Sequence, residues 1–103
     1  MDKRQAIIIA TKYIDSLKDK YDIRRVILFG SYAKGTYTND SDIDLAIIMN
    51  NVTDRIDIQA ELMKLRRKVD LRIEPHPFDY SDFNHNDPMV DEILKYGINL
   101  EVA

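Results

Sequence analysis

The chain of 103 residues is long enough for one domain and too short for two ordinary ones, and its 45% hydrophobic and 32% charged residues are the balance of a folded domain. A net charge of −3 argues against a protein that binds long nucleic acid through its phosphates, and the absence of cysteine excludes disulfides and thiolate metal sites. No apolar run approaches the roughly 20 residues of a membrane span and no secretory signal is apparent, so we expect a cytoplasmic protein without membrane contact.

Helical and extended patterns alternate in the first half of the chain. Apolar residues recur at helical spacing between residues 2 and 21, which predicts a first helix. The β-branched run IRRVILF (23–29) predicts a strand that stops at Gly30, and a short helix can begin after this glycine. The run DIDLAIIM (42–49) predicts a second strand whose later half is buried on both faces.

A helix and a strand are expected next. Thr53 or Asp54 can cap a helix that runs to about Lys68. The segment VDLRIEP (69–75) alternates between apolar and polar residues, which predicts a third strand that ends at its proline.

The C-terminal part predicts one more helix and an edge strand. PMVDEILKYG (88–97) starts with proline and ends with glycine, as helices often do, and INLEV (98–102) can add an edge strand. Since an exposed edge invites pairing, we expect association with another protein or with a second copy of the chain. The order α-β-β-α-β-α-β indicates an α+β fold, with helices flanking a mixed β-sheet in a single domain over residues 1–103.

Two aspartates stand at the start of the second predicted strand. Side chains at positions i and i+2 share a face, so Asp42 and Asp44 point the same way, about 7 Å apart along the strand. Their mutual repulsion costs stability unless a cation lies between them. Carboxylate oxygens suit hard divalent cations, and magnesium is the usual choice where phosphates are present. An isolated Asp-x-Asp is weak evidence, because such pairs are often only solvated.

Gly30 and Ser31 follow the first predicted strand directly. Glycine allows a sharp turn and the close approach of a ligand, and a helix that begins here offers backbone N–H groups to a phosphate. Ser31 adds a hydroxyl donor and Lys34 a positive charge. Alone, Gly-Ser most often marks a simple turn. Its combination with Asp-x-Asp about ten residues later is what favours phosphate chemistry.

This combination, in the segment GSYAKGTYTNDSDIDLAII, resembles the signature of the DNA polymerase β-type nucleotidyltransferase superfamily, and within it the small stand-alone group of minimal nucleotidyltransferases. The likeness covers about residues 23–75. It implies a polymerase β-like palm fold, with ATP as the substrate and two magnesium ions as cofactors. Lys34 stands where the pattern often has arginine, which keeps the charge but loses a bidentate phosphate grip.

The resemblance also implies a third carboxylate on a neighbouring strand. Asp70 and Glu74 are the candidates, and both would lie on one face of the predicted strand 69–75. Val69-Asp70-Leu71 matches the family pattern, so Asp70 is predicted as the third acid. In this interpretation three acids hold the metals and carry the catalysis: Asp42, Asp44 and Asp70. Three residues hold the β- and γ-phosphates: Gly30, Ser31 and Lys34.

The function implied by the resemblance is transfer of AMP from ATP to a hydroxyl group. The minimal group is commonly encoded beside a HEPN-type toxin, so the implied acceptor is that partner and the chain would act as its antitoxin. Two alternatives stay open: an antitoxin that acts by binding alone, and an adenylyltransferase that modifies a small molecule such as an aminoglycoside.

A histidine and two tyrosines near these motifs have two interpretations each. His76 is a structural residue between two prolines, the commoner role, or it contacts a substrate. Tyr32 and Tyr37 flank the phosphate loop, and exposure of these rings would allow them to stack on a base.

Overall fold

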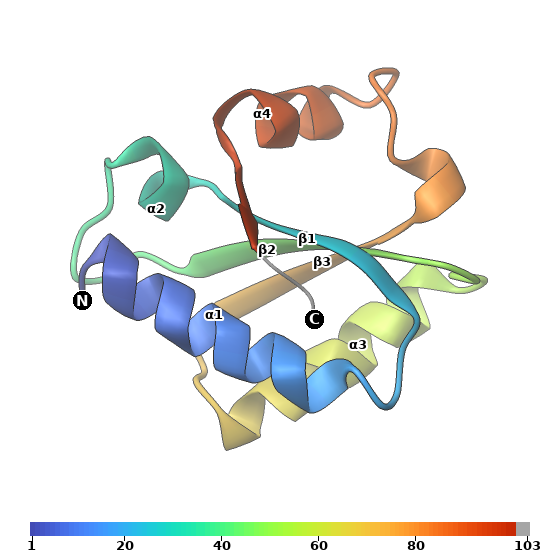
Figure 1. Ribbon diagram of the computed structural model, residues 1–103, viewed down its shortest axis with the longest axis horizontal. Coiled ribbons are helices and arrows are strands. Elements are labelled where there is room, and N and C mark those ends of the chain that lie inside the picture. Colours follow the sequence, from blue (N-terminus) through green and yellow to red (C-terminus); the bar gives the residue numbers. More distant parts are fainter. Residues whose placement is uncertain (101–103) are drawn as a thin grey trace.

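The computed structural model describes residues 1–100 and shows a four-stranded sheet in the order β3-β2-β1-β4 (Figure 1). β1 (Ile23–Phe29) lies between β2 (Ile43–Met49) and β4 (Ile98–Leu100) and is antiparallel to both. β3 (Ile73–Asp79) is parallel to β2. The mixed sheet predicted from the sequence is confirmed, and the last two residues of the predicted edge strand 98–102 lie outside the described residues.

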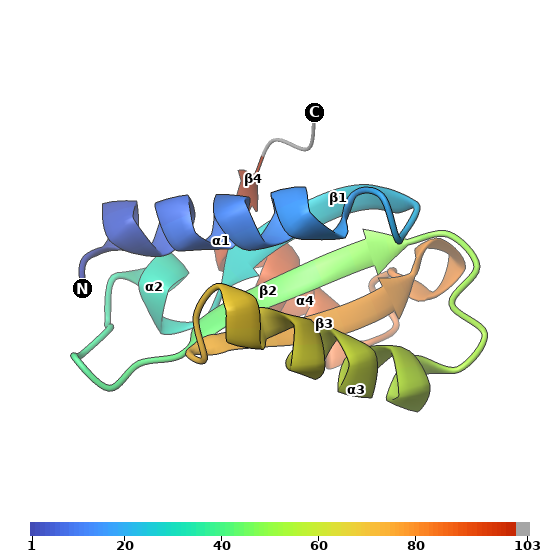
Figure 2. The same ribbon diagram turned by 90° about the horizontal axis from the view of Figure 1, so that it is seen from below.

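Helices cover both faces of this sheet, which confirms the α+β class. α1 (Lys3–Leu17) and α3 (Arg55–Leu65) lie on the near side of the sheet in Figure 2, and α4 (Pro88–Tyr96) lies behind it. Across residues 1–100, no helix combines the length and apolar character required for a membrane crossing. Three short helices lie between the longer elements: α2 (Ser31–Lys34) and the 3-10 helices η1 (Arg66–Lys68) and η2 (Tyr80–Asp82).

An aspartate side chain caps the N-terminus of each of the longer helices α1, α3 and α4. Asp2, Asp54 and Asp87 each accept a backbone N–H from the first turn of α1, α3 and α4, at 2.8 to 3.1 Å. The Gln5 side chain in turn accepts the backbone N–H of Asp2, which completes a capping box. α1 ends at Leu17, earlier than the predicted helix 2–21.

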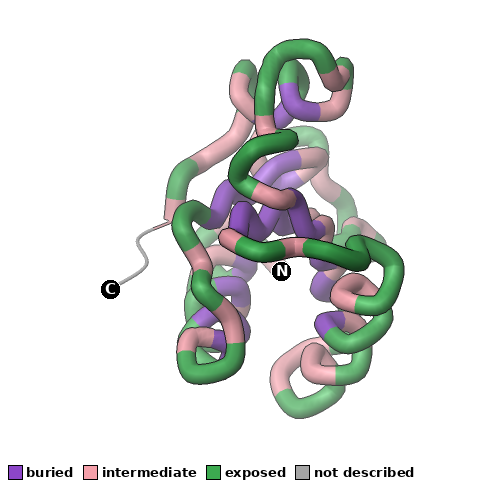
Figure 3. The backbone as a smooth tube through the Cα atoms, turned by 90° about the vertical axis from the view of Figure 1, so that its right-hand side faces the viewer, coloured by how far each residue is buried: buried purple, intermediate pink, exposed green. Residues whose placement is uncertain are grey.

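β2 contributes alternate residues to two hydrophobic cores. The α1/α3 core lies between these two helices and the sheet, and β2 supplies Ile43, Leu45, Ile47 and Met49 to it. Figure 3 shows buried residues gathered in the interior of the molecule, with exposed residues around them. The second, smaller core lies under α4. This α4 core consists of Ile27, Phe29, Ala46, Ile48, Phe78, Val90 and Ile93.

The third strand differs from its predicted range of 69–75. Asp70 lies before β3, where its Oδ1 accepts hydrogen bonds from the backbone N–H and the Nε of Arg72, both at 2.9 Å. These local bonds fold residues 70–72 into a turn, and Leu71 is 65% exposed. The prediction that Asp70 lies on the strand is therefore wrong, because its side chain bonds within the turn.

β3 accommodates two prolines because it is an edge strand. Proline lacks the N–H that a central strand would need, so it is tolerated where that position faces away from the neighbouring strand. Two side chains from the α3 region cover the outer carbonyls: Arg66 donates to the carbonyl of Ile73 at 2.8 Å, and Gln59 to that of Pro75 at 3.0 Å. The strand therefore continues through Pro75 and Pro77 to Asp79, past the predicted end at residue 75.

Candidate active site

The candidate site lies where β1 ends and β2 begins. Phe29, the last residue of β1, pairs with Asp44, so the Gly30 turn follows directly beside that aspartate. Gly30 has φ +73° and ψ −151°, a backbone conformation that favours glycine. A Cβ at Gly30 would lie 2.4 Å from Asp44 Oδ2. Glycine is therefore required here both by the backbone and by the carboxylate against it.

Asp42 and Asp44 differ in how the strand holds them. β2 begins at Ile43, so Asp42 is exposed just before the strand, while Asp44 is half-buried within it. The backbone N–H of Ile43 donates to the carbonyl of Arg72 at 2.8 Å, which ties the start of β2 to the turn before β3. The predicted pair therefore consists of one acid fixed by the sheet and one at its rim.

Glu74 is the acid that the sheet places next to Asp44. The two residues are paired in the parallel register of β2 and β3, and paired residues of adjacent strands project from the same face. Glu74 Oε1 lies 3.9 Å from Arg66 Nη1. From the sequence, Glu74 is a candidate, but Asp70 is the predicted third acid.

Asp70 is occupied by a different partner. Arg72 Nη2 lies 2.7 Å from Asp70 Oδ2, and this side-chain hydrogen bonding holds the pKa of the Asp70 carboxyl below its usual range. The carboxylate already has a cationic partner, and it lies in a turn rather than on the strand beside Asp44. The structure thus brings Glu74, and not Asp70, into register with Asp44.

His76 also lies at this end of the sheet. Its Nε2 is 3.4 Å from Asp44 Oδ1, and its ring centroid is 5.1 Å from that of Phe29. The sequence alone favours a structural role for His76 over contact with a substrate. The two-residue period of a strand could have indicated the place of His76 beside the acids, since His76 follows Glu74 by two positions and shares its face.

The predicted phosphate-binding residues Ser31 and Lys34 both lie on α2. Ser31, the residue directly after Gly30, is half-buried. Lys34 is exposed and turns toward α4, where its ammonium forms an ion pair with Glu92 and lies 5.0 Å from the ring centroid of Tyr96. The structure therefore places Ser31 at the turn and gives Lys34 a partner on α4.

The two tyrosines near the phosphate loop pack on each other. Tyr32 is fully buried in the α1/α3 core, and its ring stacks on that of Tyr37 with centroids 4.7 Å apart. The exposure that base stacking would require of Tyr32 is absent.

Carboxylate oxygens are the donors available for a metal. Within residues 1–100, no three His, Asp or Glu side chains are close enough together to form a ready metal site. The donor set of Asp42, Asp44 and Glu74 nevertheless has the oxygen chemistry that hard divalent cations prefer. A side chain at Gly30 would collide with Asp44 Oδ2, so glycine is what lets this oxygen lie directly against the turn.

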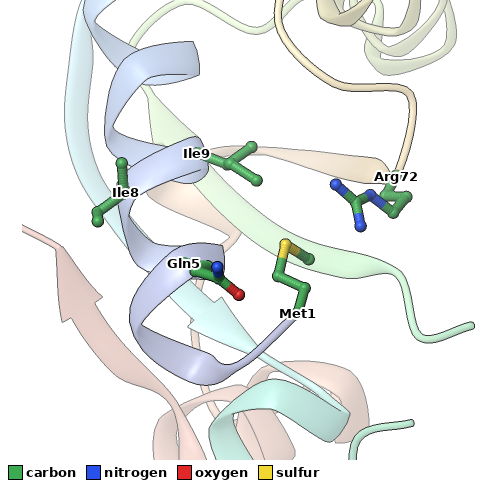
Figure 4. Close-up of a pocket in the computed structure, with 5 residues that line it drawn as sticks. All are labelled: Met1, Gln5, Ile8, Ile9 and Arg72. Carbon is green, nitrogen blue, oxygen red and sulfur yellow. The ribbon is translucent and has the colours of Figure 1, made fainter. Parts of the chain in front are cut away.

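Two cavities lie away from these acids. One, of about 410 Å³, is lined by Met1, Gln5, Ile8, Ile9 and Arg72, and Figure 4 shows it between the start of α1 and the turn before β3. The other, of about 610 Å³, includes Arg24, Arg25 and Tyr80. Neither cavity is lined by an acid of the candidate site.

The fold and the Gly-Ser turn beside Asp44 are those of a nucleotidyltransferase. Residues 10–99 match the model of the nucleotidyltransferase domain family, and the chain belongs to this family. The nucleotidyltransferase superfamily expected from the sequence is confirmed.

Relatives of this chain are found in Methanocaldococcus jannaschii. One is 34% identical over 86 residues, which cover 82% of this chain and 83% of the relative. Another is 46% identical over 50 residues, which are 47% of each chain, so the match spans about half the length of that relative. The names of both give protein adenylyltransferase as a predicted activity.

Solved structures share the fold. A predicted nucleotidyltransferase from Sulfolobus solfataricus has a TM-score of 0.69 at 17% identity, covering 94% of this chain and 80% of that one. A toxin-antitoxin solved with AMP-PNP has a TM-score of 0.66 at 25% identity, covering 94% and 73%. A mutant of the toxin-antitoxin MntA-HpeT has a TM-score of 0.64 at 27% identity, covering 91% and 72%.

Proposed function

We propose that this chain transfers AMP from ATP to a hydroxyl group on a protein partner, with magnesium as its cofactor. The observation that carries the proposal is the packing of the Gly30 turn against the Asp44 carboxylate. Because Gly30 has no side chain, a triphosphate at this turn can approach the acid closely. The names of the relatives support transfer to a protein.

The proposed third acid is Glu74 in place of Asp70. Glu74 pairs with Asp44 across β2 and β3, whereas Asp70 is held by Arg72. Asp42, Asp44 and Glu74 would hold magnesium, which when bound lowers the pKa of the attacking hydroxyl and stabilises the leaving oxygen.

The residues of the chain bind the nucleotide and take up the proton. The hydroxyl of Ser31 donates to the phosphates, and Lys34 leaves Glu92 to bind them, at little cost because exposed ion pairs are weak. The acceptor oxygen bonds to the α-phosphorus, the bond between this phosphorus and the β-phosphate oxygen breaks, and pyrophosphate leaves. The hydroxyl proton passes to a carboxylate oxygen of Glu74.

The openness of the site favours a protein as the acceptor. Asp42 is exposed, and Asp44 and Glu74 are half-buried at the end of the sheet. Small acceptors must be surrounded to be oriented, whereas a protein acceptor brings its own surface and completes the site from outside. The two toxin-antitoxin neighbours, at 25% and 27% identity, support a toxin as that protein, and we propose one of the HEPN type.

A label-transfer assay tests this function. The chain is incubated with magnesium, ATP labelled at the α-phosphate, and either the product of the adjacent gene or a panel of aminoglycosides. We expect label on the protein and none on the antibiotics. The double variant Asp42→Asn/Asp44→Asn should reduce transfer on the order of 10³-fold, because it removes anionic ligands at the reacting phosphate.

The matched control is Asp40→Asn, which makes the same chemical change at an exposed position of the same loop. It should transfer label as the wild type does. Rapid labelling of an aminoglycoside with none on the protein would replace the proposed acceptor by a small molecule. Tight complex formation without label would show that the chain acts by binding alone.

A further inference from the structure

The Asp44 carboxylate is held between two elements of the fold. Oδ2 faces the Gly30 turn, where a Cβ would come within 2.4 Å of it. Oδ1 faces β3, where His76 Nε2 lies 3.4 Å away. One oxygen is therefore presented to the turn where we place the triphosphate, and the other is directed toward an imidazole.

His76 is itself held in place by its neighbours. Pro75 and Pro77 fix φ on both sides of it, which restricts the backbone that carries the ring. The carbonyl of Pro75 is also anchored, since it accepts a hydrogen bond from Gln59 at 3.0 Å. On the sheet face, the His76 ring packs against Phe29 at an interplanar angle of 60°. The imidazole therefore reaches Asp44 from a constrained strand.

We propose that His76 is a positioning residue for nucleotidyl transfer. Its Nε2–H donates to Asp44 Oδ1, which fixes the rotation of the carboxylate and leaves Oδ2 directed at the Gly30–Ser31 turn. The proposal rests on the function proposed above and adds a residue to it. The 3.4 Å separation is long for a hydrogen bond, and such contacts tighten when substrate binds.

Two substitutions of His76 separate hydrogen bonding from packing. His76→Phe keeps a ring against Phe29 and removes the donor. His76→Gln gives up the ring and supplies an amide N–H at a similar distance from the backbone. The matched control is His85→Phe, since His85 is exposed and pairs with Asp91 away from the site.

The readouts are thermal unfolding, the affinity for Mn²⁺ by titration of its free electron paramagnetic resonance signal, and kcat and KM for magnesium-ATP with the protein acceptor. We expect His76→Phe to keep the Tm within about 2 °C, because the ring packing is retained. Its kcat should fall about 10- to 100-fold, which is the usual effect of losing a group that orients a metal ligand. KM should change less than about threefold. Mn²⁺ should bind about tenfold more weakly. His76→Gln should recover most of both losses, and His85→Phe should match the wild type.

Two results would overturn the proposal while leaving the proposed function intact. One is a His76→Phe variant as active as the wild type, and a loss confined to His76→Gln would then assign the effect to ring packing. The other is equal losses in the Phe and Gln variants, because a restored donor would then recover no activity. The opposite case is also distinguishable. If the wild type transfers no label but His76→Phe still weakens Mn²⁺ binding, the positioning role stands and the proposed function fails. If the wild type binds no Mn²⁺ and transfers no label, both fail.

Discussion

The two faces of β2 differ in how completely helices cover them. On one face, Ile43, Leu45, Ile47 and Met49 are all buried against α1 and α3. On the other face, α4 covers Ala46 and Ile48, but Asp44 is only half-buried. On the α4 face, β2 therefore changes from the buried Ala46 to the half-buried Asp44 within two residues.

This difference shows where the fold can carry charge. Carboxylates buried without partners would be costly, and a strand with both faces covered has no room for them. On β2 the α4 core includes Ala46 and Ile48 but not Asp44. The acids at the start of this strand therefore keep contact with water and with ligands. We infer that the α1/α3 core supplies most of the stability, and that the uncovered end of the α4 face supplies the chemistry.

The sharpest test of this comparison replaces each of the two candidate acids near β3 separately by its amide. Glu74→Gln should lower kcat for label transfer about 10²- to 10³-fold, because it removes the acid in register with Asp44. Asp70→Asn makes the same chemical change in the turn and should change kcat less than about threefold. Steady-state kinetics with magnesium-ATP decide between them. The reverse ranking would restore Asp70, the acid preferred from the sequence, as the third carboxylate.

The preference for Asp70 shows which signals the sequence lacked. Val69-Asp70-Leu71 alternates like a strand, and prolines at 75 and 77 argue against one. The strand nevertheless contains both prolines because β3 lies at an edge, and edge position is a property of the topology rather than of the local pattern. The local bonds from Asp70 to Arg72 decide the turn, and a pattern of apolar and polar residues does not reveal them.

Other parts of the molecule were predictable because local signals agree with the fold. The apolar runs of β1 and β2, Gly30 directly after β1 and Asp54 before α3 each predict their element without reference to the rest of the chain. The contacts of His76 with Asp44 and of Lys34 with Glu92 join residues that are far apart in the sequence. Such contacts need the register of the sheet and the placement of α4, which the sequence pattern alone does not supply.

A second test compares neighbouring residues on the two faces of β2. Leu45→Ala leaves a cavity in the α1/α3 core and should lower the free energy of unfolding by about 2–4 kcal/mol. Asp44→Asn changes the open face and should alter the free energy of unfolding by about 0.5 kcal/mol or less. Urea unfolding followed by circular dichroism measures both. If the Asp44 variant is as destabilised as the Leu45 variant, the acid is structural and the division between the faces fails.

The smallest expected effect concerns the stability that Asp70 gives the turn before β3. Arg72 lowers the pKa of this carboxyl from 3.8, so the folded state favours the ionised form. A depressed carboxyl pKa stabilises the fold above the unfolded-state value, and this stabilisation is lost as the pH falls through the folded-state pKa. Asp70→Asn should therefore cost about 1 kcal/mol or less at pH 7, because the Arg72 side chain is 45% exposed and solvent weakens the ion pair. The difference from the wild type should shrink as the pH approaches 3, in urea unfolding at both pH values. A cost that stays constant over this range would show that shape rather than charge fixes Asp70 in the turn. Loss of the backbone bond from Arg72 would not explain such a cost, because an asparagine oxygen can also accept it.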